Sequence, residues 1–188
     1  MSKCKGFTII ETMVGLAIMM SLISIGVPSL NNFIVFTRVD NEIFSLHRLI
    51  LTARNSALTN NTSVTLCPLS NKGKCKNLWH QELSVFTDSN NNKVFEPELN
   101  EQIVANKSAI KVGDKLQYGK TRIGLTYAST GHLAGWGQNA TFSYCPEFHN
   151  DKNRGIVVAS SGRAYVSASS KTNNTNIRRT GVKIKCNN

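Results

Sequence analysis

The 188-residue sequence lacks the motifs that would mark a catalytic or metal-binding protein. It contains no Cys-x-x-Cys pair, and its four histidines are scattered along the chain, which argues against a zinc site. Gly-x-Ser-x-Gly and His-Glu-x-x-His motifs are also absent. We therefore expect the protein to be no enzyme and to hold no cofactor or metal ion.

Acidic residues are missing from residues 152–188, which hold eight of the 22 Lys and Arg residues. The whole chain has a formal net charge of +11 and a sequence pI of about 9.7. A basic tail of this kind predicts an acidic partner such as nucleic acid, a lipid headgroup or an acidic protein. The alternative is a solvated face that only keeps the protein soluble.

Charged residues are also nearly absent from residues 7–30, where Glu11 is the single one. A run of this length can cross a bilayer, whereas residues 31–188 are polar enough to form a body outside it. A basic start precedes the run, but no Ala-x-Ala site follows it, so an ordinary secretory signal is disfavoured. An ionised carboxylate inside lipid costs about 3 kcal/mol, so Glu11 requires a partner.

Residues 5–11, Lys-Gly-Phe-Thr-Ile-Ile-Glu, resemble the class III signal of type IV pilins and type II secretion pseudopilins. The resemblance implies that a prepilin peptidase cuts between Gly6 and Phe7 and then methylates the new amino group of Phe7. It also implies that Glu11 pairs with that amino group in a neighbouring subunit, and Pro28 stands where these helices commonly kink. A plain single-span anchor with an accidental glutamate is the alternative.

The sequence pattern, together with this resemblance, divides the chain into four segments. These are a leader at residues 1–6, a membrane or filament-core helix at 7–30, an amphipathic helix half at 31–60 and a β-rich domain at 61–188. Apolar residues at spacings of three and four mark one face of the amphipathic half, from Phe36 and Val39 to Ala57, and we expect the helix to end at Thr59. We expect strands at residues 62–67, 83–86, 103–110, 121–127, 140–144, 155–159 and 164–167.

Residues 46–68 narrow the resemblance to the FimT/GspH family. They carry its Ala-Arg pair, its alanine and its strand ending Leu-Cys, here Ala53-Arg54, Ala57 and Leu66-Cys67. The implied α+β fold packs a long N-terminal helix on an antiparallel sheet domain. The implied partners are other major and minor pilins, the prepilin peptidase and the bacterial inner membrane, with the globular domain in the periplasm and later in a pilus. The cysteines favour the pilus FimT/FimU-like branch, and a GspH-like secretion pseudopilin without DNA binding stays open.

The chain has five cysteines, and Cys4 would be removed with the leader. The remaining four allow three pairings and indicate an oxidising compartment. We predict a Cys67–Cys75 bridge, which closes a short loop, and a Cys145–Cys186 bridge, which ties the basic tail to a strand.

Members of the FimT-like branch bind DNA during natural transformation through a C-terminal Gly-Arg-x-Arg motif, which Gly162-Arg163-Ala164-Tyr165 resembles. Arg163 matches the first arginine, whereas Tyr165 replaces the second. A tyrosine can stack on a base or bond a phosphate, and other basic residues can restore the lost charge. Those candidates are Arg178, Arg179, Lys183 and Lys185. The alternative is that Arg163 only caps a turn between strands.

Residues 88–92, Asp-Ser-Asn-Asn-Asn, are similar to the first ligands of a calcium loop. However, Lys93 occupies the position of the required glycine, and Leu99 stands where the bidentate glutamate belongs. We therefore expect a hairpin turn here. We also expect a loop at residues 172–176, which are similarly rich in asparagine.

Overall fold

The computed structural model describes residues 6–135, 137–169, 176–177, 184 and 186. The chain divides into two compact units, residues 1–37 and residues 38–188. One helix, α1(Ile9–Thr59), contributes to both units, and each unit is described by itself below.

In the first unit, α1 carries long apolar side chains that are almost all solvent-exposed, among them Ile9, Leu16 and Leu22. The helix is long and apolar enough to cross a membrane, judged by length and composition. It continues through Pro28 without a break. Exposed apolar side chains in a helix of this length are typical of a segment that lies in lipid or packs on other apolar helices.

In the second unit, α1 buries one face, and its end at Thr59 confirms the predicted end of the helix. The buried residues are Val39, Ile43, Leu46, Ile50, Ala53 and Ala57, as the spacing predicted. Full burial of each Ile or Leu among them contributes about 2 kcal/mol. Phe36 was wrongly assigned to this face, because it is 53% exposed and Val35 is buried instead. At 100° per residue, Phe36 lies about 20° from Ile43, at the edge of the buried stripe, and it belongs to the first unit.

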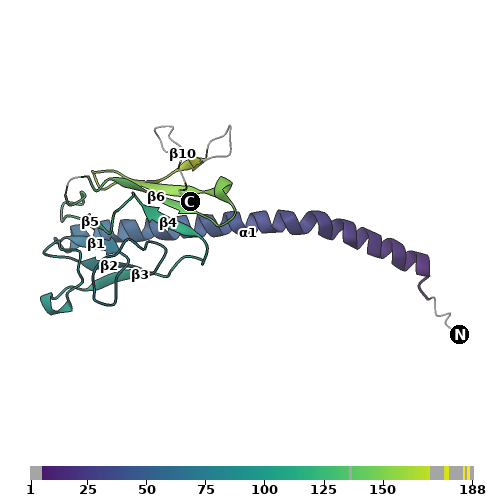
Figure 1. Cartoon of the computed structure of the whole chain (residues 1–188), viewed down its shortest axis with the longest axis horizontal. Coiled ribbons are helices and arrows are strands. Elements are labelled where there is room, and N and C mark those ends of the chain that lie inside the picture. Colours follow the sequence, from purple (N-terminus) through teal and green to yellow (C-terminus); the bar gives the residue numbers. More distant parts are fainter. Residues whose placement is uncertain (1–5, 136, 170–175, 178–183, 185, 187–188) are drawn as a thin grey trace. The chain divides into compact units, whose positions relative to one another are not determined.

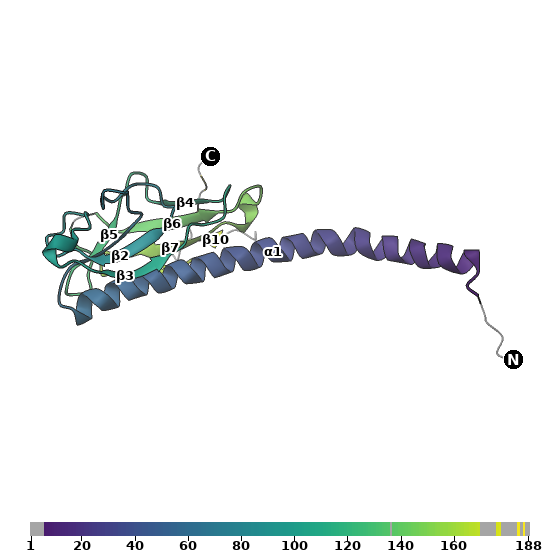
Figure 2. The same ribbon diagram turned by 90° about the horizontal axis from the view of Figure 1, so that it is seen from below.

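The described part of the second unit contains two four-stranded antiparallel sheets, which lie on one side of its part of α1 (Figures 1 and 2). The first sheet has the order β3(Ile103–Lys107), β2(Leu83–Thr87), β1(Val64–Cys67) and β5(Leu125–Tyr127). The second has the order β4(Lys115–Tyr118), β6(Ala140–Cys145), β7(Arg154–Val158) and β8(Ala164–Val166). Further elements are the short pair β9(Ala168–Ser169) and β10(Asn176–Ile177) and the 3-10 helices η1(Pro97–Leu99) and η2(Asn150–Lys152).

The predicted strands are present, but several are shorter than expected, and β4 and the two-residue strands β9 and β10 were missed. The strands predicted at 103–110 and 121–127 are reduced to β3 and β5. Strand β4 was not predicted because it has only two inward-facing residues, Leu116 and Tyr118, which alternate with polar residues. Asn176, predicted to lie in a loop, begins the two-residue strand β10, whereas residues 172–175 lie outside the described residues.

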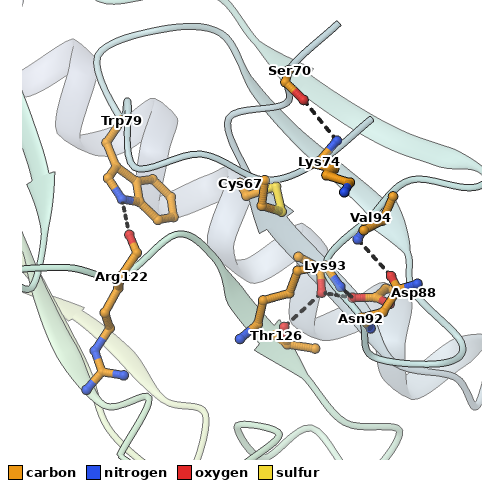
Figure 3. Close-up of a disulfide and its surroundings, with 12 residues drawn as sticks. Cys67, Ser70, Lys74, Trp79, Asp88, Asn92, Lys93, Val94, Arg122 and Thr126 are labelled. Carbon is orange, nitrogen blue, oxygen red and sulfur yellow. Dashed lines mark hydrogen bonds between the residues drawn. A yellow bond between two sulfur atoms is a disulfide. The ribbon is translucent and has the colours of Figure 1, made fainter. Parts of the chain in front are cut away.

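An aromatic cluster joins the segment after β1 to the second sheet. Trp79 makes edge contacts with Tyr118 and Phe142, with ring centroids 5.2 Å and 5.1 Å away. The indole Nε1 of Trp79 donates a hydrogen bond to the carbonyl of Arg122 at 2.7 Å, as Figure 3 shows. The buried polar atom is therefore satisfied, and the cluster is part of the core.

Three charged residues of α1 pair with residues of the surrounding segments, a function that the sequence pattern did not reveal. The pairs are Arg38–Asp114, Asp40–Arg154 and Glu42–Lys107. Asp114 is buried and also accepts hydrogen bonds from the Tyr144 hydroxyl and from the backbone N–H of Glu147. Burial, together with the bond to Asp114, raises the pKa of Tyr144, so its hydroxyl stays protonated and donates.

Candidate functional site

The N-terminal candidate residues lie at the start of α1. Gly6 has open space around it, and the Phe7 side chain is 83% exposed. Glu11 Oε2 accepts a hydrogen bond from the Thr8 backbone N–H at 3.4 Å, and the Glu11 N–H donates to Thr8 Oγ1 at 3.3 Å. This reciprocal pair is a capping box, which satisfies two of the free N–H groups at the helix start.

The capping box gives Glu11 a local function that the sequence reasoning missed. The signal was present, because Thr8-x-x-Glu11 before an apolar run is its usual pattern. A glutamine at this position can make the same cap, so the cap alone does not require a charged side chain. The Gly6–Phe7 cleavage and the pairing of Glu11 with a neighbouring subunit therefore remain proposals about processing and assembly.

The four cysteines of the globular unit form the two predicted disulfides. Cys67 at the end of β1 bonds to Cys75, with Cα atoms 5.6 Å apart. Cys145 at the end of β6 bonds to Cys186, with Cα atoms 5.9 Å apart. The predicted pairing is thus confirmed, whereas Cys4 lies outside the described residues.

Arg163 lies at the turn between β7 and β8 with its side chain exposed. The turn is closed by hydrogen bonds from the Gly162 N–H to the Ala159 carbonyl and from the Ala159 N–H to the Arg163 carbonyl, both 2.9 Å. Gly162 has φ +77°, and a Cβ on it would lie 1.9 Å from the Gly131 carbonyl oxygen. The glycine of the candidate motif is therefore required by the backbone, and it presents Arg163 to solvent.

Tyr165 belongs to β8, where it stands opposite Val157 of β7. Its side chain is half-buried, so a flat ring face for stacking on a base is only partly available. Residues 164 and 166 point to the opposite face of the sheet, because side chains alternate along a strand. Tyr165 therefore lies on the face of β8 opposite to that of residues 164 and 166, and Arg163 precedes the strand.

The C-terminal segment is anchored where the structure describes it. Ile184 is buried, and its carbonyl accepts a hydrogen bond from Asn153 Nδ2 at 2.9 Å. The Cys145–Cys186 disulfide ties the segment to β6 two residues later. The remaining candidate residues Arg178, Arg179, Lys183 and Lys185 lie outside the described residues.

The segment similar to a calcium loop is closed by the carboxylate of Asp88, which is 0% exposed. Its oxygens accept hydrogen bonds from Thr65 Oγ1 at 2.6 Å, from the Asn92 N–H at 3.0 Å and from the Lys93 N–H at 3.1 Å (Figure 3). The predicted turn is present, but it opens the long connection of residues 88–102 between β2 and β3 and is not a tight hairpin. Asp88 therefore uses its oxygens on protein donors.

Two regions of the chain match known protein families. Residues 43–162 match the family described as Type II transport protein GspH. Residues 1–27 match the prokaryotic N-terminal methylation motif, which includes Gly6, Phe7 and Glu11. No functionally curated protein is similar enough to count as a relative.

Solved structures of one minor pilin, in two crystal forms, show the same fold. The Pseudomonas aeruginosa type IV minor pilin FimU is 17% identical, with 74% of this chain and 95% of that chain covered and a TM-score of 0.56. A second crystal form of FimU gives 18% identity, 68% and 90% coverage and a TM-score of 0.50. The Vibrio cholerae minor pseudopilin EpsH gives 13% identity, 70% and 97% coverage and a TM-score of 0.49. The predicted α+β fold, a long N-terminal helix packed on antiparallel sheets, is confirmed.

Proposed function

We propose, from the premise that the chain belongs to the family of the type II transport protein GspH, that it is a minor pilin of a type IV pilus. The observation that carries the proposal is the start of α1. There, Gly6 and Phe7 precede a capped helix whose apolar residues are exposed and need lipid or other subunits to cover them. The family consists of filament subunits, so we propose a structural role without catalysis.

The proposed path of the protein begins in the bacterial inner membrane, with residues 38–188 in the periplasm and later in the pilus. Two disulfides support an oxidising compartment for this unit. The proposed partners are other pilins and the prepilin peptidase. The second candidate is a minor pseudopilin of a type II secretion system, which would use the same N-terminus and fold in another machine.

We expect the mature chain to begin with N-methylated Phe7 and to be present in the sheared pilus fraction. The reason is that the peptidase site and the apolar helix together direct the chain into a filament. Mass spectrometry of the N-terminal peptide from purified pili checks both points. A chain that keeps residues 1–6 in a host with an active prepilin peptidase would contradict the processing step, whereas absence from pili with normal processing favours the secretion system.

We further propose that the protein binds double-stranded DNA weakly and without sequence preference. The exposed Arg163, held by the Gly162 turn, supports this proposal, and so does the excess of basic residues from 152 to 188. Lys and Arg side chains neutralise phosphates and release counterions, which gives micromolar or weaker affinity for nonspecific sites at physiological salt. The bond of Cys186 to Cys145 supports a fixed position for the end of the basic segment.

We expect Arg163→Gln to weaken duplex binding and to flatten the slope of log K against log salt by about 0.9, the effect of one lost phosphate contact. Tyr165→Arg should strengthen binding, because it restores the second arginine of the motif. Gel shifts on the disulfide-intact chain at several salt concentrations measure both. Affinity that neither substitution changes would leave the chain as a pilin without this DNA contact.

A further inference from the structure

A second basic surface lies far from the C-terminal segment in sequence. Residues 43–81 contain no Asp or Glu, and three of their lysines fall within five residues. These lysines belong to the loop of residues 67–76, which we call the lysine loop. They are Lys72, Lys74 and Lys76.

The lysine loop is held in one conformation by its backbone. The Cys67–Cys75 disulfide closes it, and the Ser70 N–H donates to the Lys74 carbonyl at 2.8 Å. Figure 3 shows Ser70 beside Lys74, where Ser70 Oγ accepts from the Lys74 N–H at 3.0 Å. Gly73 has φ +72°, and its Cα faces the Phe95 carbonyl so closely that a Cβ would lie 2.6 Å from that oxygen. The three lysines are therefore presented on a rigid frame.

The side chains of the lysine loop form an open basic pocket. Its volume is about 450 Å³, and it is lined by Ser70, Asn71, Lys72, Lys74 and Lys76. The three lysines are exposed, and in the part of the chain that the structure describes no carboxylate pairs with them. Their charge is thus available to an anion from outside the chain.

We propose that the lysine loop is a contact site for the phosphodiester backbone of nucleic acid. Lysine ammonium groups act as point charges toward phosphates, and they do not read base edges as the planar fork of arginine does. The contact would therefore raise affinity without sequence preference. The choice of nucleic acid over other polyanions rests on the proposed DNA-binding function.

The position of the loop favours a long polyanion over a single phosphate. Strand β5 lies between the lysine loop and the turn that carries Arg163. A Cβ on Gly124, directly before β5, would lie 3.6 Å from Cys75 Sγ, and Tyr127 at the end of β5 donates to the Gly162 carbonyl at 3.1 Å. Three residues of strand span about 10 Å. The two basic points are therefore separated by at least a short strand, which is more than one phosphate group covers, and we expect a long polymer to contact both.

The test uses the full-length, disulfide-intact chain in detergent and a fluorescent 30-base-pair duplex, with anisotropy measured over a range of salt concentrations. We expect the triple variant Lys72→Gln/Lys74→Gln/Lys76→Gln to bind at least tenfold more weakly at low salt. Its slope of log K against log salt should flatten by about 2.7, since three phosphate contacts are lost. Because the three substituted side chains are exposed, we expect the variant to keep the thermal stability of the parent chain.

Two controls separate this site from general charge. The triple Lys→Arg variant of the same positions should keep its affinity and slope. The variant Lys111→Gln/Lys115→Gln/Lys120→Gln removes three exposed lysines elsewhere and should change binding much less. Equal weakening by both Gln triples would overturn the proposal, because total charge would then explain the effect.

The outcome also separates this site from the proposed DNA function. If Arg163→Gln weakens binding and the lysine-loop triple does not, the proposed DNA binding stands and the lysine-loop site is wrong. If the parent chain does not bind the duplex, both nucleic-acid proposals fail. The parent chain could instead bind lipopolysaccharide micelles and not the duplex, with that binding lost in the Lys72→Gln/Lys74→Gln/Lys76→Gln variant. This result would overturn the nucleic-acid assignment and keep only the anion site.

Discussion

A chain carrying Glu11→Gln should remain folded and be processed at Gly6, yet fail to enter filaments. We propose that the Glu11 carboxylate neutralises the N-terminal amino group of Phe7 in a neighbouring subunit. Removal of one partner of a buried ion pair costs about 3–5 kcal/mol, because the other charge is left unpaired in an apolar environment. That loss, repeated at each incorporation, is large enough to stop assembly of the chain.

The capping box makes the choice of substitution decisive. Glutamine keeps the hydrogen bond from the Thr8 N–H to the side chain of residue 11, so Glu11→Gln removes the charge and retains the cap. Thr8→Ala does the reverse, since it removes the hydroxyl that accepts the Glu11 N–H and leaves the carboxylate. Loss of such a cap costs about 1 kcal/mol, which a filament-core helix can tolerate. We therefore expect normal incorporation of Thr8→Ala.

The measurement is the amount of each variant in sheared pili relative to its amount in the membrane. Resistance of the membrane-bound variants to protease, with both disulfides formed, would show that the globular unit is folded. If Glu11→Gln enters filaments as well as the parent and Thr8→Ala does not, the side chain of Glu11 acts as a cap and the charge-pairing proposal is wrong.

The fold was predictable wherever a periodic pattern reports burial. Ile43, Leu46 and Ile50 recur at helical spacing, and burial against the sheets follows from that spacing. Strand β4 escaped prediction because its two inward residues, Leu116 and Tyr118, are too few to establish alternation. Short edge strands are fixed by their neighbours, and the pairing of β4 with β6 is a tertiary contact that no local pattern encodes.

The candidate site was less predictable because its decisive features are contacts between distant segments. The ion pairs of Arg38, Asp40 and Glu42 look in sequence like the solvated face of a helix. The segment that begins with Asp88 is similar in sequence to the start of a calcium loop. In the fold, the carboxylate of Asp88 binds protein donors that include Thr65 from another strand. Motif spacing singled out Gly6, Phe7 and Glu11, because these residues lie close together in the chain within the N-terminal methylation motif. The disulfide of the lysine loop was predicted, but the loop became a candidate site only when the placement of its lysines was visible.

The Gly162→Ala substitution should destabilise the globular unit by about 3 kcal/mol. A residue with a Cβ at φ +77° costs about 1–2 kcal/mol. In addition, the new Cβ would lie 1.9 Å from the Gly131 carbonyl oxygen, and that oxygen already accepts a hydrogen bond from Arg54 Nε at 3.0 Å. The turn or the loop must move, which costs a further 1–3 kcal/mol by about the measure of overpacked cores.

Gly137→Ala is the matched control, because Gly137 has φ +72° but only Arg122 Nη2, 3.8 Å away, near its Cβ position. It should show the cost of the left-handed backbone alone. In thermal unfolding of the disulfide-intact chain, Gly162→Ala should lower the midpoint temperature by about 6–12 °C. Gly137→Ala should lower it by about half as much. Equal shifts would mean that the turn is not packed on Gly131. We expect the larger shift for Gly162→Ala and no change of stability for Arg163→Gln. This difference would show that Gly162 holds the turn and that Arg163 only presents its charge to DNA.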